Sequence, residues 1–296
     1  EPALARAQFI HNSADLAATS VDVFVNGALF YGDFDFRTAT PFVDVPAEVE
    51  LTIDIAPAGA GIESSVFNTN VTLTADETYV IVANGIVSDT GYDPAPAFAI
   101  YPFAPAREVG EAVDETDLLV FHGSTDAPEV SVWAMGGDAA LFNFSYGEFA
   151  GYLGLPTDDY VIEVRTADGS AVVAAYEAPL GTLNLEGAAL TVVASGFLNP
   201  ADNSDGPAFG LFVATADGGA LLELPLYEEE PLIGDSCDNP IVVDVIGDPL
   251  VDYAISSEPY PDLFESSWIN PTSSYMNGNN IVFQFTLENT SLVSGS

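Results

Sequence analysis

The chain has 296 residues, 48% of them hydrophobic, and it carries 45 Asp and Glu against four Lys and Arg, for a formal net charge of −41 at pH 7. A surface with this charge repels phosphate groups, which excludes nucleic acid and anionic lipid as partners. The apolar content is sufficient for packed cores in two or three domains and excludes a disordered chain, while the apolar runs are of strand length, short of the roughly 20 residues that a membrane-spanning helix needs.

Repulsion among the unbalanced carboxylates predicts that salt stabilises this protein. Salt screens exposed charges over about 10 Å or less, and bound divalent cations relieve the same repulsion. We therefore expect a higher melting temperature in about 1 M NaCl, where the screening length is about 3 Å, than in dilute buffer. Calorimetry checks this. An unchanged or lower melting temperature would contradict the saline habitat that we infer, and would favour biased genome composition combined with selection for solubility.

The first predicted elements are the strands of a module spanning residues 1–110. Residues 9–15 begin with a short apolar run, and residues 21–26 and 50–55 alternate apolar and polar side chains. This alternation is the period of a strand with one buried face. Gly, Pro, Asn and Asp residues separate the runs, and no helical period is sustained. We therefore expect any helix to be a single turn.

A second module, residues 111–230, repeats the first. Residues 7–106 reappear at 118–217, so that Phe-Ile-His-Asn-Ser-Ala-Asp at 9–15 recurs as Val-Phe-His-Gly-Ser-Thr-Asp at 120–126. Self-similarity over this length predicts two modules of one fold. Several short strands separated by turns predict an antiparallel β-sandwich for each module.

Two acidic segments mark the predicted boundaries. Residues 107–117 join the copies, and residues 227–231, Tyr-Glu-Glu-Glu-Pro, follow the second one. Charge runs of this kind are typical of solvated connections. A third segment, residues 231–296, therefore lies outside the repeat.

The opening of each copy resembles a known family. His-Asn-Ser-Ala-Asp at residues 11–15, followed by Val-Asp-Val-Phe-Val-Asn-Gly at 21–27, is similar to the His-Ala-Ser-Pro-Asp-Ala and Val-Asp-Val-Tyr-Val-Asp-Gly signature of the DUF4397 family. The second copy matches at residues 122–128 and departs at 132–135. The resemblance implies extracellular or periplasmic bacterial β-sandwich modules and leaves function open. Since the chain begins at Glu1 rather than Met, we expect a secreted product after removal of a signal peptide.

The third segment resembles another kind of domain. Residues 234–242 and 275–286 are similar to the first half of the pre-peptidase-type jelly-roll domains of secreted proteins from gliding and marine bacteria. In that pattern the first cysteine often pairs with a second, but Cys237 is the only cysteine here. The segment is too short for a complete jelly roll and would leave exposed strand edges. Either the natural chain continues, or another copy completes the domain by strand addition at residues 281–286, which would build a filament.

The fold class predicted from these observations is all-β, with tandem antiparallel β-sandwich modules and a partial third β domain. Catalytic patterns such as Gly-x-Ser-x-Gly or His-Glu-x-x-His do not occur. Only His11 and His122 titrate near neutral pH, and they occupy equivalent places in separate modules. We expect each to order the loop that follows it through hydrogen bonds to a nearby Ser or Asp: Ser13, Asp15, Ser124 or Asp126. We predict a protein that is not an enzyme and has no cofactor.

Two acidic loops at equivalent positions of the copies form the candidate metal site. Residues 88–93 and 199–206 place carboxylate and amide oxygens on turns that contain glycine. Ca²⁺ takes six to eight oxygen ligands of this kind. The candidate ligands are Asp89, Asp93, Asp202 and Asp205. The alternative is that turns are simply acidic in an acidic protein, because neither loop has the spacing of an EF-hand.

Trp133 is the candidate residue for glycan contact. It occupies the place of Asp22 in the other copy, and the alternation of the strand directs it outward. An exposed indole ring can stack on a sugar, whereas aromatic residues at strand spacing more often pack in a core.

We predict a non-enzymatic, extracellular structural or adhesive protein of the cell surface, with other copies of itself or other surface components as partners and a self-assembling fibre as one form. The alternative is a glycan- or calcium-binding accessory module of a larger secreted protein. Neither function involves nucleic acid or membrane insertion.

Overall fold

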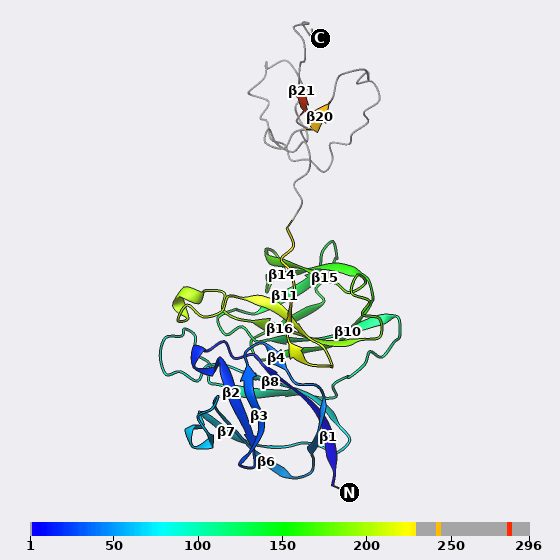
Figure 1. Cartoon of the computed structure of the whole chain (residues 1–296). Helices are drawn as coiled ribbons and strands as arrows, with labels where there is room; N and C mark the ends of the chain where they lie inside the picture. Colours follow the sequence, from blue (N-terminus) through cyan, green and yellow to red (C-terminus); the bar gives the residue numbers. More distant parts are fainter. Residues whose placement is uncertain (1, 229–240, 244–282, 286–296) are drawn as a thin grey trace, which may run out of the picture. The chain divides into compact units, whose positions relative to one another are not determined.

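The computed structural model describes residues 2–228, 241–243 and 283–285 of the chain. The fold is all-β, with two tandem sandwiches, as predicted (Figure 1). Within the described residues the helical elements are single 3₁₀ turns: η1 (Leu16–Ala18), η2 (Ile62–Ser64) and η3 (Pro200–Asp202). No helix in this part of the chain is long and apolar enough to cross a membrane.

The first sandwich has an outer sheet of order β3-β2-β6-β7 and an inner sheet of order β18-β4-β1-β8-β9, with β5 also paired to β1. The strands are β1 (Leu4–His11), β2 (Ser20–Val25), β3 (Ala28–Asp35), β4 (Thr38–Ala39), β5 (Val43–Pro46), β6 (Glu50–Pro57), β7 (Phe67–Thr72), β8 (Thr78–Asn84) and β9 (Ala99–Phe103). The short strand β18 (Gly219–Ala220) comes from the second copy and pairs with β4. The copies are therefore joined by strand pairing as well as by the chain.

The second sandwich has an inner sheet of order β13-β10-β16-β17-β19 and an outer sheet of order β12-β11-β14-β15. Its strands are β10 (Glu115–His122), β11 (Val130–Ala134), β12 (Phe142–Phe144), β13 (Phe149–Pro156), β14 (Asp159–Thr166), β15 (Val172–Pro179), β16 (Ala189–Ser195), β17 (Gly210–Ala214) and β19 (Leu222–Glu223).

The repeat is confirmed in the strand register. β1 pairs in parallel with β8, and β10 pairs in parallel with β16. In these pairs His11 lies opposite Ala83, and His122 lies opposite Ala194. The other strand pairs of the two sandwiches are antiparallel, so each inner sheet is mixed and each outer sheet is antiparallel.

The inner sheets are buried on both faces. On β10, Leu118 and Val120 pack into the second sandwich, whereas Leu119 and Phe121 face the first copy. The same division holds on β8, where Ile81 and Val82 lie on opposite faces. Strands buried on both faces carry continuous apolar runs rather than alternation. This accounts for the apolar stretch at residues 79–83 and for the stretch at 188–194, which is apolar except for Thr191.

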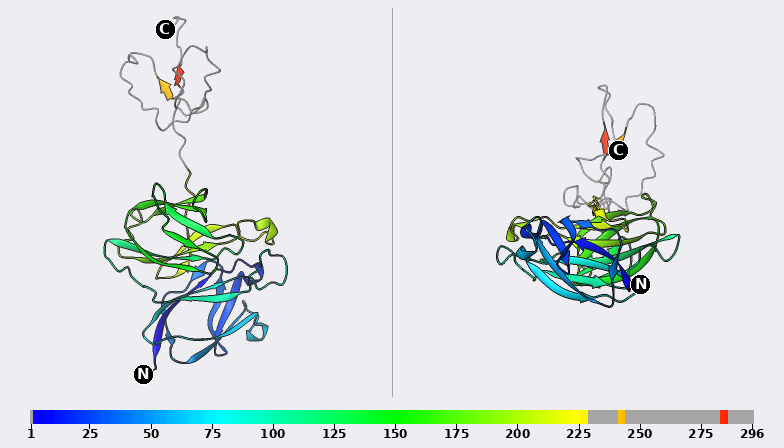
Figure 2. Two further views of the ribbon diagram at one scale, coloured as in Figure 1. Left: turned by 180° about the vertical axis from the view of Figure 1, so that it is seen from behind. Right: turned by 60° about the horizontal axis from the view of Figure 1, so that its bottom comes forward.

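The two inner sheets therefore pack against each other through one apolar layer, here called the shared layer (Figures 1 and 2). Its fully buried side chains are Ile10, Val80, Val82, Leu119, Phe121 and Val193. The rings of Phe121 and Tyr101, one from each copy, lie 5.3 Å apart between centroids. Residues 2–227 thus form four stacked sheets, and they belong to one compact unit, Glu1–Tyr227.

The acidic segment between the copies, residues 107–117, is held against the fold. The Arg107 guanidinium contacts the carboxylate of Asp117 at 2.7 Å, and the Arg107 backbone N–H donates to the Tyr152 hydroxyl at 2.8 Å. The side chain of Asp117 is buried. These contacts fix the connection between the copies even though five of its eleven residues are acidic.

In the second compact unit, Glu228–Ser296, the structure describes Glu228 and the two strands β20 (Ile241–Val243) and β21 (Phe283–Phe285), which pair in parallel. Cys237 and most of the jelly-roll resemblance lie outside the described residues. The predicted boundaries at residues 110 and 230, the partial third domain and strand sharing at residues 281–286 stay predictions.

Candidate functional site

His11 ends β1 and begins the signature loop of the first copy. Its imidazole is fully buried, and its Nε2 lies 2.6 Å from the carbonyl oxygen of Ala18. Because a carbonyl oxygen only accepts, Nε2 carries the hydrogen in this contact. Burial lowers the pKa of His11 to about 4, so the ring is neutral at physiological pH. The expected structural role holds, but the predicted partners were wrong, because the hydrogen bond goes to the backbone carbonyl of Ala18 rather than to Ser13 or Asp15.

Asp15 holds two loops of the first copy together. Its Oδ2 accepts from the backbone N–H groups of Val87 at 2.8 Å and Ser88 at 2.7 Å, and its Oδ1 accepts from that of Ala17 at 2.9 Å. Burial raises the pKa of this carboxyl group, but the hydrogen bonds from Ala17 and Ser88 outweigh it and leave the pKa below its usual value. The carboxylate is saturated with donors from its own chain.

The second copy repeats this arrangement. The Nε2 of His122 lies 3.0 Å from the carbonyl oxygen of Pro128, and burial lowers the pKa of the imidazole. Asp126 accepts from the backbone N–H groups of Leu198 at 2.9 Å and Asn199 at 2.8 Å. The polar residues of the signature therefore order loops in both copies.

The two acidic loops that the sequence singles out meet between the copies. The backbone N–H of Asp93 donates to the Asn203 Oδ1 at 3.1 Å, and the Ser204 hydroxyl donates to the carbonyl of Gly91 at 2.8 Å. Beneath them the rings of Tyr92 and Phe197 lie 5.7 Å apart between centroids. The loops thus bind each other.

The predicted calcium ligands are exposed on these loops: Asp89, Asp93, Asp202 and Asp205. One of them, Asp202, already accepts a hydrogen bond from the Asn199 amide. In the described part of the chain, no group of three or more His, Cys, Asp and Glu side chains is placed to hold a metal ion. Calcium binding stays a prediction.

A polar seam, made of residues 12, 37, 84, 123 and 195, lies at the end of the shared layer. The Asn84 amide donates to the carbonyl of Gly123 at 2.9 Å, and the Arg37 Nε donates to the Ser195 hydroxyl at 3.0 Å. Asn84 and Ser195 are equivalent positions of the repeat, so the same strand position of each copy makes a hydrogen bond with the other copy. Burial lowers the pKa of Arg37 to about 10, which leaves it charged at neutral pH.

One sequence difference between the copies has its cause in this seam. Asn12 of the first copy is equivalent to Gly123 of the second, and a Cβ at position 123 would lie 2.1 Å from the Asn12 Nδ2. Only glycine at position 123 leaves room for the side-chain amide of Asn12. Sequence reasoning missed this contact, although the Asn-to-Gly change within an otherwise matched motif is a signal for it.

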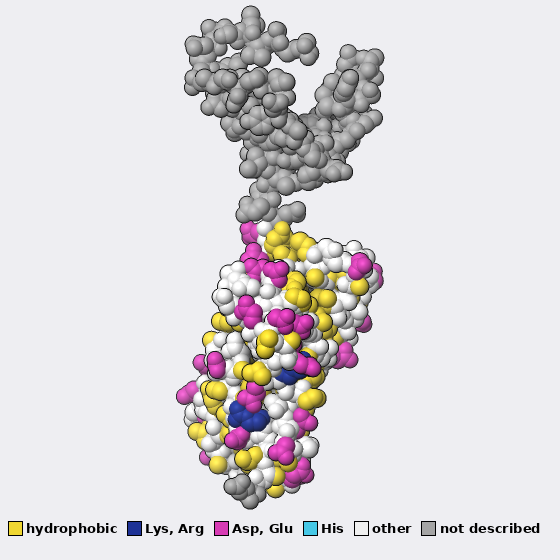
Figure 3. Space-filling view, turned by 90° about the vertical axis from the view of Figure 1, so that its right-hand side faces the viewer, with side chains coloured by type: hydrophobic (Ala, Val, Ile, Leu, Met, Phe, Trp, Pro, Cys, Tyr) yellow, Lys and Arg dark blue, Asp and Glu magenta, His cyan; other side chains and the backbone are white. Residues whose placement is uncertain are grey.

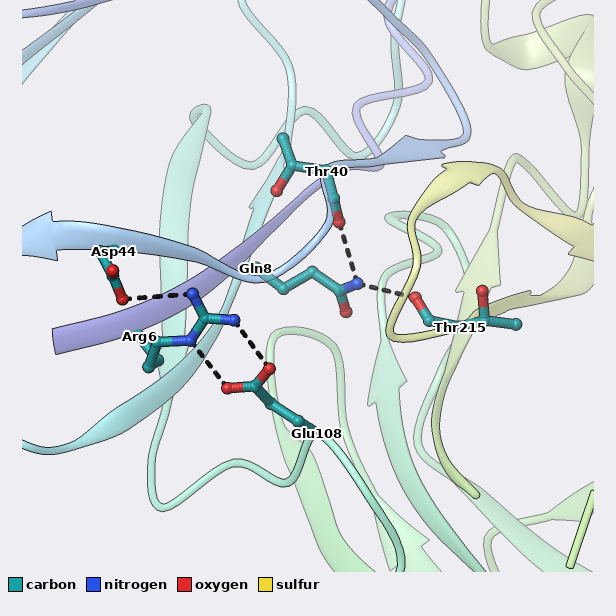
Figure 4. A network of polar contacts seen from close by, with 6 residues as sticks. All are labelled: Arg6, Gln8, Thr40, Asp44, Glu108 and Thr215. Atoms are coloured by element: carbon teal, nitrogen blue, oxygen red, sulfur yellow. Dashed lines mark hydrogen bonds and ion pairs between the residues drawn. The ribbon is translucent and has the colours of Figure 1, made fainter. Parts of the chain in front are cut away.

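The other arginines also hold segments that are distant in the sequence. Arg6 pairs with Glu108 at 2.8 Å and with Asp44 at 3.2 Å, and the hydrogen bond with Glu108 raises the pKa of the guanidinium (Figure 4). Beside it, the Gln8 amide of the first copy donates to the carbonyl of Thr215 at 2.8 Å. These contacts tie the first copy to the connecting segment and to the second copy.

Trp133 is half-buried on β11. Its Nε1 donates to the Ser131 hydroxyl at 2.9 Å, and the Arg165 guanidinium lies 4.4 Å from its ring centroid. Arg165 in turn pairs with Glu163. One face of the ring is therefore occupied by a cation, and glycan stacking on this residue stays a prediction.

Comparison with known proteins gives a match to one family model. The model described as "Domain of unknown function (DUF4397)" matches residues 5–97 and 116–208. Comparison with curated protein sequences gives no match.

Among solved structures, the chain is similar to a family 26 carbohydrate-binding module from Eubacterium rectale Amy13K in complex with maltoheptaose, with 8% identity, a TM-score of 0.22 and coverage of 65% of this chain and 92% of that one. It is also similar to family 41 carbohydrate-binding modules from streptococcal virulence factors that recognise α-glucan, with 13% identity, a TM-score of 0.20 and coverage of 64% and 92%. These TM-scores are too low to carry a function over to this chain.

Proposed function

We propose that this chain, which belongs to the DUF4397 family and carries two copies of its domain, is a non-enzymatic structural protein of the cell surface. In this role residues 2–227 act as one rigid spacer, and the remaining chain attaches the spacer to other copies or to other surface components. The observation that carries the proposal is the shared layer, because it makes two sandwiches into one body.

The shared layer supports rigidity for a physical reason. Two modules joined only by a polar connection would reorient freely, whereas side chains such as Phe121 and Val193 would be exposed to water by any such motion. Exposing buried apolar surface costs about 25 cal/mol per Å². The seam adds hydrogen bonds from Asn84 and Arg37 that would also be lost. Separation of the copies is therefore opposed both by the exposure of apolar surface and by the loss of these hydrogen bonds.

The charge of the exposed surface bears on how the protein meets its partners. Figure 3 shows acidic side chains distributed over one face of the molecule and few basic ones. The basic residues Arg6, Arg107 and Arg165 are engaged in ion pairs, and Arg37 is engaged in the seam. A surface of this kind stays soluble without a cationic site, which suits a protein that meets its partners through its ends rather than through its sides.

Pulling the full chain from both ends in a single-molecule force experiment tests the spacer role. We expect residues 2–227 to unfold in one step that releases about 75 nm of chain, at roughly 3.3–3.6 Å per residue. The single step follows from the shared layer, because loss of either sandwich exposes a face of the other.

Two steps of about half that length would contradict the proposal, since they would mean that the copies unfold independently. Val113→Ala is a matched control, because this side chain is 88% exposed and should leave the single step unchanged.

A further inference from the structure

The second sandwich encloses a cavity of about 310 Å³ between its two sheets. Its lining is almost entirely apolar and comes from both sheets. On the inner sheet it includes Leu118, Val120 and Val192, and on the outer sheet Val132, Phe144 and Ile162. Protein interiors are otherwise packed as densely as organic crystals, with few voids larger than a water molecule. A closed apolar cavity of about 150 Å³ binds benzene, so apolar cavities in protein interiors can hold apolar molecules.

The equivalent space in the first sandwich is about 90 Å³. One cause lies in the sequence, because Phe9 of the first copy occupies the strand position that Val120 occupies in the second. The Phe9 ring fills its sandwich and packs edge to face on Phe30, with the centroids 5.5 Å apart. Valine at the same position leaves that space open. Since stability falls as the volume left empty grows, a void kept in one copy and filled in the other points to an occupant.

The cavity reaches the surface at the end of the sandwich where β10 and β16 finish. Val173 and Leu198 line it there, although their side chains are 55% and 43% exposed. Glu129 lies in the same lining and is exposed. Arg165 also lines the cavity, but its charge is balanced by the ion pair with Glu163. An entering molecule therefore meets apolar side chains and an acidic group without a free cation to balance it.

We propose that the second sandwich is a binding site for a small, neutral, hydrocarbon-rich molecule such as a medium-chain alcohol or its ester. A cavity of about 150 Å³ holds benzene, so by proportion this one holds a molecule of about eight to twelve carbon atoms. The apolar lining selects a hydrocarbon body. The acidic entrance and the net charge of −41 disfavour a carboxylate or phosphate head group. This inference does not depend on the spacer role.

Binding is tested with the full chain, using the neutral fluorescent probe 1-naphthylamine, whose ten carbon atoms match the size of the cavity, and then 1-octanol and octanoate as competitors at pH 7. We expect saturable binding of the probe, displacement by 1-octanol, and at least tenfold weaker displacement by octanoate. We also expect 1-octanol to raise the melting temperature of the wild-type protein, because a ligand that binds only the folded state stabilises it.

Val120→Phe gives the second copy the ring that the first copy has. It should weaken probe binding at least tenfold while the melting temperature without ligand stays equal or rises, because the void is filled. Val172→Phe is the matched control, since the Val172 side chain is 52% exposed and does not line the cavity. This variant should bind the probe like wild type.

Absence of saturable binding, or equal binding by Val120→Phe and wild type, would overturn the proposal. Equal displacement by octanoate and 1-octanol would overturn its claim of a neutral ligand. If Val120→Phe does not fold, the melting temperature of the wild type in 1-octanol is the deciding measurement. A melting temperature that does not rise would reject the site.

Discussion

Phe121→Ala is expected to lower the free energy of unfolding by about 3–5 kcal/mol, the range for a buried phenylalanine replaced by alanine. The Phe121 side chain is fully buried in the shared layer. Its ring centroid lies 4.7 Å from that of Phe149 and 5.3 Å from that of Tyr101, so the substitution removes contacts within its own copy and across to the other. Denaturant unfolding of the full chain, followed by circular dichroism, measures the change.

The control for this prediction is Leu29→Ala. The Leu29 side chain lies on β3 and is 59% exposed, so its removal should cost less than half as much. Equal losses from the two substitutions would show that the shared layer contributes no more than a surface side chain. The rigid spacer would then lose its structural basis.

Acid is expected to destabilise the protein between pH 6.5 and about 4. The unfolded chain binds a proton at His11 near pH 6.5, whereas the folded chain binds it only near pH 4, because burial lowers the pKa. In this interval the unfolded state holds more protons, so stability falls as the pH falls. The full effect from His11 is about 3 kcal/mol. It is complete below about pH 4 and absent above about pH 7.

Protonation of the many carboxylates relieves repulsion as the pH approaches 4, which opposes this loss. The comparison must therefore be made with a variant that lacks only the titrating ring. His11→Gln keeps an N–H donor for the carbonyl of Ala18 but does not titrate. Urea unfolding at steps from pH 7 to pH 4 should give a steeper fall for the wild type than for the variant. Parallel curves would reject the assignment to His11.

The fold could be predicted because its signals are local. Alternation at Leu51, Ile53 and Ile55 depends on one buried face of one strand, and the period of two follows from backbone geometry alone. The duplication needed no structure at all, since residues 7–106 and 118–217 carry the same motifs in the same order. The structural role of His11 also followed from the sequence, but its hydrogen-bond partner did not, because several acceptors lie within reach of one loop.

The tertiary structure alone decided how the copies meet. A local pattern reports that a side chain is buried, but it does not report what covers it. The apolar runs at 79–83 and 188–194 indicated elements of strand length, but only the packing shows that these strands are buried on both faces and that each inner sheet is covered by the other copy. The contact of Asn12 with the space left by Gly123 and the cavity beside Val120 likewise depend on residues far apart in the sequence. The sequence therefore determined the strands and the repeat, whereas the shared layer, the seam and the cavity arise from contacts between distant segments, which no local pattern encodes.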